Sequence, residues 1–253
     1  MLPSLGRIPY LNTEPFFGDD PVRVEARTAT PRGMIDLVRG GQVDVAPLPI
    51  VASFDHPDLF VPVGDMGIAT QADAKSVLLF SQVPPADLGG RPIGVIDDTA
   101  TSARLLSVLL QRYYAVGGYR LVPLDVAADA VLLIGDRALL QSPHDPRYPH
   151  VTDLAAAWHE WTGLPFVFAA WMQRAGVAPA NAAAAVDYLD RQLTINLEDL
   201  GALAARRPDC GLDAAAVRRY LQTFEYRFGP RAWSAVDRFR ELDAQVSVQH
   251  DAA

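Results

Sequence analysis

Three hydroxyl side chains fall within the four residues Thr99-Ala100-Thr101-Ser102, where an apolar strand pattern gives way to a helix pattern. The first turn of a helix leaves backbone N–H groups without partners and carries the positive end of the helix dipole. Hydroxyl groups beside such a helix end are suited to hold a carboxylate or a phosphate. A hydroxyl of Thr101 or Ser102 could equally act only as the helix cap, and no GxxxxGK[ST] phosphate loop is present.

Polar residues also stand at the ends of other predicted strands. Tyr10-Leu11-Asn12-Thr13 follows the first strand, Ser76 opens an apolar strand, and Gly135-Asp136 follows a later one. In an α/β fold, side chains at the carboxyl ends of strands face a ligand site. A turn, a strand-end hydrogen bond or a helix cap at Asp136 would use the same residue types. Ser76 lacks the Gly-x-Ser-x-Gly surroundings of a hydrolase nucleophile.

The sequence offers little for metal, thiol or amine chemistry. The five histidines do not pair at metal-ligand spacing, and neither HExxH nor CxxC occurs. Cys210 is the only cysteine and Lys75 the only lysine. Trp158 and the turn at residues 162–165 lie near a chain crossing predicted at 172–176, where a ligand could bind, but aromatic residues in such a pattern are more typical of a core than of a ligand platform. A site would therefore be built from hydroxyls, amides and backbone N–H groups.

Charge and hydropathy narrow the class of protein. The 30 acidic residues exceed the 22 basic ones, and the resulting net charge of −8 disfavours a general nucleic-acid binder. No run reaches the roughly 18 apolar residues of a membrane span. The start at Met1–Arg7 lacks a signal-peptide pattern, so we expect a cytoplasmic protein. Salt screens charges beyond about 8 Å, so local donors can still bind an anion.

The elements that must position these residues alternate between strand and helix up to about residue 174. Helix starts are indicated at Thr30-Pro31 and at Thr152-Asp153, where a capping side chain precedes an apolar stripe. The predicted strands cover residues 6–11, 22–26, 43–49, 76–81, 92–96, 120–124, 130–134 and 164–172. Further helices are expected after residue 101 and near 180–192, 197–206, 213–227 and 230–244.

This alternation indicates an α/β fold with mixed or parallel sheets. The continuous apolar strand at 76–81 is of the kind buried on both faces of a mostly parallel sheet. Chain crossings near 82–85 and 172–176 predict two lobes. Lobe 1 would comprise residues 1–83 and 175–253, and lobe 2 the inserted residues 84–174. Such an architecture predicts a ligand cleft between the lobes.

Six segments, in this order, resemble the chorismate dehydratase family of the futalosine route to menaquinone. They run GRIPYLNTEPFF, GGQVDVAPLPIVASF, SVLLFS, DDTATSARLL, LLIGDRALL and DLAAAWHEWTGLPFVFAAWM, between about residues 6 and 174. Each segment alone is weak, whereas six in the right order are specific. The resemblance implies a type II periplasmic-binding-protein fold, two α/β lobes with an interlobe cleft. It also implies a lyase that dehydrates chorismate to 3-[(1-carboxyvinyl)oxy]benzoate without a metal or other cofactor.

Site residues follow in part from this resemblance and in part from the patterns above. By analogy with the family, Asn12 and Ser76 are the catalytic candidates, as polar residues that contact the reacting ring. The candidates for binding the dianionic substrate are Tyr10, Pro47, Leu48, Thr99, Ala100, Thr101, Ser102, Gly135, Asp136 and Trp158. Because the matched segments offer few bases, the preferred proton acceptor is the substrate's own enolpyruvyl carboxylate. Asp136, or Ser76 with water, is the alternative.

Two other functions stay open at this point. The sibling enzyme of the pathway, 1,4-dihydroxy-6-naphthoate synthase, shares the fold, although IPYLNTEPF and WHEWTGLPFVFAAW resemble the dehydratase more closely. A non-catalytic small-anion-binding protein would bind chorismate without turnover, and the absence of a signal peptide and of a lipid-anchor cysteine disfavours a transport role. The sequence does not determine the oligomeric state and leaves a homodimer open.

Overall fold

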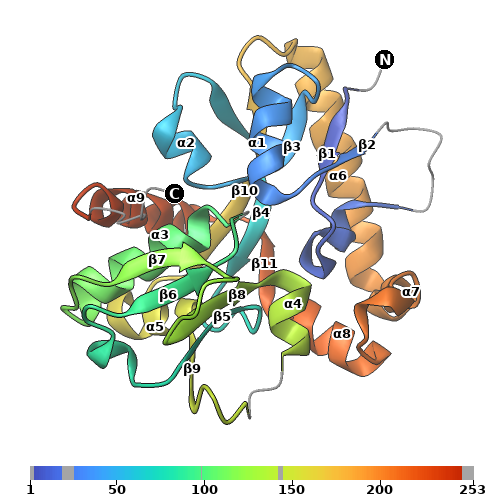
Figure 1. The fold of residues 1–253 in the computed structure, drawn as a ribbon. Coiled ribbons are helices and arrows are strands. Elements are labelled where there is room, and N and C mark those ends of the chain that lie inside the picture. The colour runs from blue at the N-terminus through green and yellow to red at the C-terminus, as the bar shows by residue number, and fades with distance from the viewer. Residues whose placement is uncertain (1–2, 19–25, 98, 142–144, 247–253) are drawn as a thin grey trace. The chain divides into compact units, whose positions relative to one another are not determined.

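The alternating strands and helices form two β-sheets in the computed structural model, one in each of two units (Figure 1). The structure describes residues 3–18, 26–97, 99–141 and 145–246. Unit 1 comprises Met1–Ala69 and Val167–Pro230, and unit 2 comprises Thr70–Phe166 and Arg231–Ala253. The predicted α/β class with two lobes is therefore confirmed.

Unit 1 is built on a six-stranded mixed sheet with the order β11-β4-β10-β3-β1-β2. Its strands are Leu5–Arg7 (β1), Ala26–Thr28 (β2), Val45–Pro49 (β3), Phe60–Thr70 (β4), Phe166–Arg174 (β10) and Phe224–Arg227 (β11). Strand β1 runs parallel to β2 and β3, whereas β10 is antiparallel to β3. Strand β3 is buried along its whole length.

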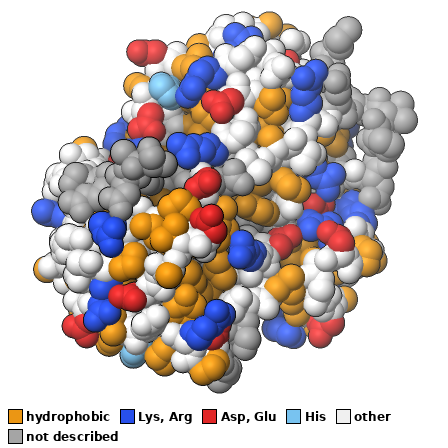
Figure 2. All heavy atoms as spheres, viewed as in Figure 1, with side chains coloured by type: hydrophobic (Ala, Val, Ile, Leu, Met, Phe, Trp, Pro, Cys, Tyr) orange, Lys and Arg blue, Asp and Glu red, His pale blue; other side chains and the backbone are white. Residues whose placement is uncertain are grey.

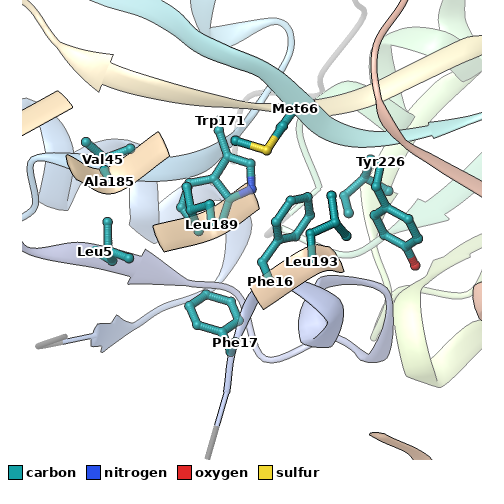
Figure 3. Packing of buried hydrophobic residues seen from close by; sticks show 11 residues of the cluster. Leu5, Phe16, Phe17, Val45, Met66, Trp171, Ala185, Leu189, Leu193 and Tyr226 are labelled. Carbon is teal, nitrogen blue, oxygen red and sulfur yellow. The ribbon is translucent and has the colours of Figure 1, made fainter. Parts of the chain in front are cut away.

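Helices cover this sheet and contribute to its core. They are Pro31–Arg39 (α1), Ala52–Asp55 (α2), Pro179–Glu198 (α6), Leu200–Ala205 (α7) and Ala214–Leu221 (α8), with 3-10 turns at Leu11–Phe16 (η1) and Pro208–Cys210 (η4). Helix α1 begins as predicted, because the Thr30 side chain accepts a hydrogen bond from the Gly33 N–H. Leu189 and Leu193 of α6 pack with Trp171 in a buried apolar cluster of this unit (Figure 3).

Unit 2 is built on a five-stranded sheet with the order β7-β6-β8-β5-β9. Its strands are Val77–Ser81 (β5), Pro92–Val95 (β6), Arg120–Pro123 (β7), Ala130–Ile134 (β8) and His150–Asp153 (β9). Strand β6 is parallel to β7 and β8, but β5 is antiparallel to both of its neighbours. The strand predicted at 76–81 is confirmed. The prediction that it lies among parallel strands is wrong, because an apolar run indicates burial and not the direction of the neighbouring strands.

The helices of unit 2 include one from the far C-terminal part of the chain. They are Thr101–Val108 (α3), Gly135–Leu140 (α4), Leu154–Thr162 (α5) and Pro230–Asp243 (α9), with a 3-10 turn at Pro85–Asp87 (η2) and a π-helical turn at Leu109–Tyr113 (η3). Trp158 of α5 packs edge-on against Phe166 and Phe239, with ring centroids 5.4 and 5.8 Å apart. Helix α9 therefore forms part of the core of unit 2.

The boundaries of the units differ from the predicted lobe boundaries. The chain passes from one unit to the other after Ala69, after Phe166 and after Pro230. The sequence predicted only two crossings and assigned β5 and residues 175–253 to lobe 1. Pairing of β5 with β8 and β9, and packing of Phe239 on Trp158, place β5 and α9 in unit 2. Strand pairing, and not the break at Pro84-Pro85, sets the boundary.

Several elements differ from the sequence prediction. Strands β4 and β9 were not predicted, and β11 falls within the predicted helix 213–227, whose helical part ends at Leu221. The strand predicted at residues 6–11 ends at Arg7 and is followed by the turn η1. Most of the strand predicted at 22–26 lies outside the described residues.

Basic and acidic side chains are interspersed over the face shown in Figure 2. The net charge of −8 is therefore not gathered into one acidic field on this face, and anion binding would depend on local donors. Among the helices of the described residues, none has the length and apolar character needed to cross a membrane.

Candidate functional site

Both units carry predicted site residues. Those in unit 1 are Tyr10, Asn12, Pro47 and Leu48. Those in unit 2 are Ser76, Thr99, Ala100, Thr101, Ser102, Gly135, Asp136 and Trp158.

Asn12 lies in the 3-10 turn Leu11–Phe16 that follows β1. Thr13 holds the start of this turn, since its hydroxyl donates to the carbonyls of Ile8 at 2.6 Å and Tyr10 at 2.8 Å. The Oδ1 atom of Asn12 is buried and accepts no hydrogen bond from the described residues. A buried acceptor without a donor costs about 1–3 kcal/mol, so this atom is suited to a donor on a bound molecule or a water.

A side chain from helix α6 holds the end of the same turn. The Asn196 amide donates to the carbonyls of Pro15 at 2.9 Å and Phe17 at 3.0 Å. Its oxygen accepts a hydrogen bond of 2.7 Å from Arg206. Asn196 therefore ties the backbone that carries Asn12 to the long helix of unit 1, and nothing in the local sequence around residue 12 indicates this contact.

Glu14 stands two residues after Asn12 and is only 4% exposed. Arg7 Nη2 donates to both carboxylate oxygens, at 2.9 and 2.8 Å, and Arg207 Nη1 donates to Oε1 at 2.9 Å. Arg7 also lies over the Phe17 ring, 5.0 Å from its centroid. Two guanidinium groups thus offset the cost of burying this carboxylate. We call this arrangement of Arg7, Glu14 and Arg207 the arginine clamp.

An aromatic side chain anchors the end of the turn in the core of unit 1. Phe16 packs edge-on against Trp171 and Tyr226, with ring centroids 5.3 and 5.7 Å apart (Figure 3). Pro47 and Leu48 lie in the buried strand β3, opposite β10. Their part in binding an anion stays a prediction, as does that of Tyr10.

Ser76 directly precedes β5 and is 1% exposed. Its hydroxyl donates to the Ala74 carbonyl at 3.3 Å, and its own carbonyl accepts the Gly135 N–H at 2.8 Å. The structure thus brings together Ser76 and Gly135, which are far apart in the sequence. Gly135 has φ = 59°, a value that glycine adopts without strain. Asp136 lies in the first turn of α4 and does not cap it, because Ile134 occupies the cap position.

The hydroxyl cluster lies at the start of α3, as the sequence predicts. Ala100 occupies the cap position and makes no side-chain cap bond, while Thr101 and Ser102 are the first two helical residues. The alternative that Thr101 or Ser102 is the helix cap is therefore wrong. Thr99 Oγ1 is buried and has no hydrogen-bond partner among the described residues, and Asp98 lies outside them. Binding of an anion here stays a prediction.

Trp158 occupies the core of unit 2. It is fully buried, and its indole N–H donates to the Pro165 carbonyl at 2.9 Å. This environment fits a core residue better than a ligand contact. Cys210 is also buried, with a free thiol. Within the described part of the chain, no group of three or more His, Cys, Asp or Glu side chains could hold a metal ion.

Asp153 has a second contact that the sequence did not indicate. As predicted, it caps α5, with Oδ1 accepting the N–H groups of Ala155 at 2.9 Å and Ala156 at 3.2 Å. Its other oxygen, Oδ2, accepts the N–H groups of Ala74 at 3.0 Å and Lys75 at 2.7 Å. Burial raises the pKa of Asp153, and these four hydrogen bonds offset only part of that effect. We call this arrangement the backbone clamp.

Comparison with known sequences shows that the chain is similar to proteins of menaquinone biosynthesis. The sequence profile of a family described as menaquinone biosynthesis matches residues 3–245. Chorismate dehydratase of Thermus thermophilus is 30% identical over 220 residues. The match covers 78% of this chain and 79% of that protein.

Comparison with solved structures concerns the fold. Protein AF1704 of Archaeoglobus fulgidus has a TM-score of 0.77 at 16% identity, over 96% of this chain and 97% of that one. The periplasmic aliphatic sulphonate binding protein SsuA of Escherichia coli has a TM-score of 0.64 at 13% identity, over 96% and 87% of the two chains. At such identities the likeness shows the fold alone, which is periplasmic-binding-protein-like as the resemblance implied.

Proposed function

Because this chain belongs to the menaquinone-biosynthesis family, we infer that it is a chorismate dehydratase, a hydro-lyase of menaquinone formation. The observation that carries this conclusion is the 30% identity to the Thermus thermophilus chorismate dehydratase over 78% of this chain. The matched length exceeds that of either unit, so the likeness is not confined to one sheet.

The reaction removes the ring C3 proton and the C4 hydroxyl of chorismate as water. It yields 3-[(1-carboxyvinyl)oxy]benzoate, and the new aromatic ring supplies the driving force. Loss of water causes no net oxidation or reduction. The protein's part is therefore to bind two carboxylates, orient the ring, and stabilise the departing hydroxyl.

We propose that Asn12 and Ser76 contact the reacting ring, as in the family resemblance. An amide has no basic group near neutral pH, so Asn12 would orient the substrate or donate to the departing hydroxyl. Its buried, unpartnered Oδ1 supports a contact with a bound molecule. Ser76 offers a hydroxyl whose hydrogen bond to the Ala74 carbonyl is long, at 3.3 Å. The proton acceptor we favour is the enolpyruvyl carboxylate of the substrate.

The hydroxyls at residues 99–102 are the proposed partners of a substrate carboxylate. A helix end contributes about 0.3–1 kcal/mol, and each hydrogen bond to a charged group about 1.5–3 kcal/mol. The attraction of several such donors for a carboxylate outweighs the repulsion from a screened net charge of −8. The cytoplasmic location stays a prediction, and the sequence leaves a homodimer open.

Purified protein should convert chorismate, observed as loss of the diene absorbance with formation of the aromatic product. Removing a group that stabilises the departing hydroxyl costs about 100- to 1,000-fold in kcat, so Asn12→Ala and Ser76→Ala should each lose activity on this scale. Asn181→Ala is a matched amide control. Ser53→Ala is a matched serine control, because Ser53 is also buried and also donates to a backbone carbonyl.

The outcomes separate the reaction from the site. If the wild-type protein leaves chorismate unchanged, the dehydratase assignment is wrong, and the sibling synthase or a binding protein takes its place. If the wild type is active and both Asn12→Ala and Ser76→Ala keep its rate, the reaction stands and our site residues are wrong.

A further inference from the structure

We propose that Asp153 is a positioning residue for Ser76, whose hydroxyl it presents by holding the turn at Ala74-Lys75. The inference rests on the proposed function, because it assumes that Ser76 contacts the substrate during dehydration. Asp153 acts through the backbone of this turn and is not proposed to touch the substrate.

A continuous series of hydrogen bonds connects the two side chains. Asp153 Oδ2 accepts the Ala74 N–H at 3.0 Å, and the Ala74 carbonyl accepts the Ser76 hydroxyl at 3.3 Å. Ala74 is fully buried, so neighbouring atoms restrict its movement. The position of the carboxylate therefore determines where the acceptor of the Ser76 hydroxyl lies.

The backbone conformation of Lys75 needs a restraint from outside the turn. Its φ is +60°, in the left-handed region that residues other than glycine rarely adopt. The shortest hydrogen bond in the backbone clamp, at 2.7 Å, joins the Lys75 N–H to Asp153. Without that bond the turn would relax toward negative φ, and Ser76, the next residue, would move with it.

Helix capping does not explain the second carboxylate oxygen. Asp213 caps α8 through Oδ1, at 2.7 Å from the Ala216 N–H. At Asp153 one oxygen caps α5 in the same manner, while the other reaches a turn 79 residues earlier in the chain. The chain thus contains a matched pair of capping aspartates, and Asp153 is the one that also holds a distant segment.

The test uses Asp153→Ser, which keeps a capping oxygen and removes the one that holds the turn. Asp213→Ser is the control, because it makes the same change at a cap in unit 1. A misplacement of about 1 Å can lower a rate about 100-fold, so we expect Asp153→Ser to lose about 10- to 100-fold in kcat for chorismate. KM should change less, by about threefold at most, since Ser76 acts on the reacting ring. Asp213→Ser should keep the wild-type kcat.

Two measurements separate positioning from a general loss of structure. Amide hydrogen exchange at residues 74–76 should become faster in Asp153→Ser and stay unchanged in Asp213→Ser. Adding Lys75→Asn should recover several-fold of the lost kcat, because asparagine tolerates positive φ better than lysine. If Asp153→Ser does not fold, Asp153→Asn replaces it, since it keeps the side-chain volume while placing an NH₂ group against backbone donors.

The proposal is overturned if Asp153→Ser keeps the wild-type kcat, or if Asp213→Ser loses as much. It is also overturned if kcat falls while exchange at residues 74–76 is unchanged. An inactive wild-type protein would instead overturn the proposed function. In that case, the exchange measurement still decides whether Asp153 holds the turn.

Discussion

The two units hold their catalytic candidates with carboxylates that are stabilised in opposite ways. In unit 1, Glu14 beside Asn12 is surrounded by the guanidinium groups of Arg7 and Arg207. In unit 2, Asp153 near Ser76 accepts four backbone N–H groups and forms no ion pair with the described residues. The arginine clamp depends on charge, whereas the backbone clamp depends on the local shape of the chain.

This difference predicts what should follow when the carboxylate is removed from each clamp. Removing the carboxylate from the arginine clamp leaves the guanidinium groups of Arg7 and Arg207 without the anion they share, which is an electrostatic cost that the remaining Arg207–Asp209 pair offsets only in part. Removing it from the backbone clamp leaves N–H groups that water or a new turn conformation can satisfy. We therefore expect removal of the carboxylate to affect mainly stability in unit 1. In unit 2 it should affect mainly the geometry of the turn at Ala74-Lys75.

The largest expected effect is on the arginine clamp. Breaking a buried ion pair by removing one partner costs about 3–5 kcal/mol. Glu14→Ala should lower the free energy of unfolding by about 3 kcal/mol, the low end of this range, because Arg7 is 36% exposed and Arg207 keeps its ion pair with Asp209. Chemical denaturation measures this change. Glu241→Ala is the control, because Glu241 pairs with Arg238 on the surface at 3.1 Å and should cost about 0–1 kcal/mol. Equal losses in the two variants would contradict the comparison.

A smaller effect is expected from the neutral contact that holds the same turn. Asn196→Ala removes two donors from the carbonyls of Pro15 and Phe17, and each buried group left unpaired costs about 1–3 kcal/mol. We expect a total of about 2 kcal/mol, the low end of the range for two such groups. We expect kcat to fall as well, because Asn12 lies in this turn. Asn181→Ala on the same helix should change neither quantity.

The smallest expected effect is a pH dependence of the backbone clamp. An unfolded aspartate has a pKa of about 3.9, and burial raises the pKa of Asp153 in the folded protein. The folded state then binds the proton more tightly than the unfolded chain. This contribution to stability is complete at low pH and is lost as the pH rises through the folded pKa.

The free energy of unfolding, measured from about pH 4 upward, tests this sign for wild type and Asp153→Asn. The advantage of the wild type should shrink as the pH rises. An advantage that grows with pH would mean that the four N–H groups lower the pKa more than burial raises it.

Local features of the fold could be predicted from the sequence. Residues 130–134 form the predicted strand, and α1 begins at its predicted Thr-Pro start, because both depend on neighbouring residues. The antiparallel pairing of β5 and the strand β11 could not be predicted in this way. Strand direction and pairing depend on segments distant in the sequence, and Tyr220 and Phe224 at helical spacing concealed the end of α8.

The candidate site shows the same limit. Asn12 lies in a 3-10 turn and not at the end of the predicted strand, but the hydroxyls at the start of α3 and the position of Ser76 directly before β5 follow from the local pattern. The side chains that hold them do not, because Arg207 meets Glu14 across 193 residues and Asp153 meets Ala74 across 79. Such contacts form only once the sheets have brought distant segments together.

The place of α9 also bears on how the chain folds during synthesis. The aromatic core of unit 2 is complete only when Phe239 of α9 packs against Trp158 and Phe166. At the end of α9, Asp243 forms an ion pair with Arg104. The ribosome makes α9 after every other described element. Until α9 is made, the nascent chain leaves uncovered the faces of Trp158 and Phe166 that Phe239 packs against, although unit 1 is already translated. A chaperone would have most to protect in that interval.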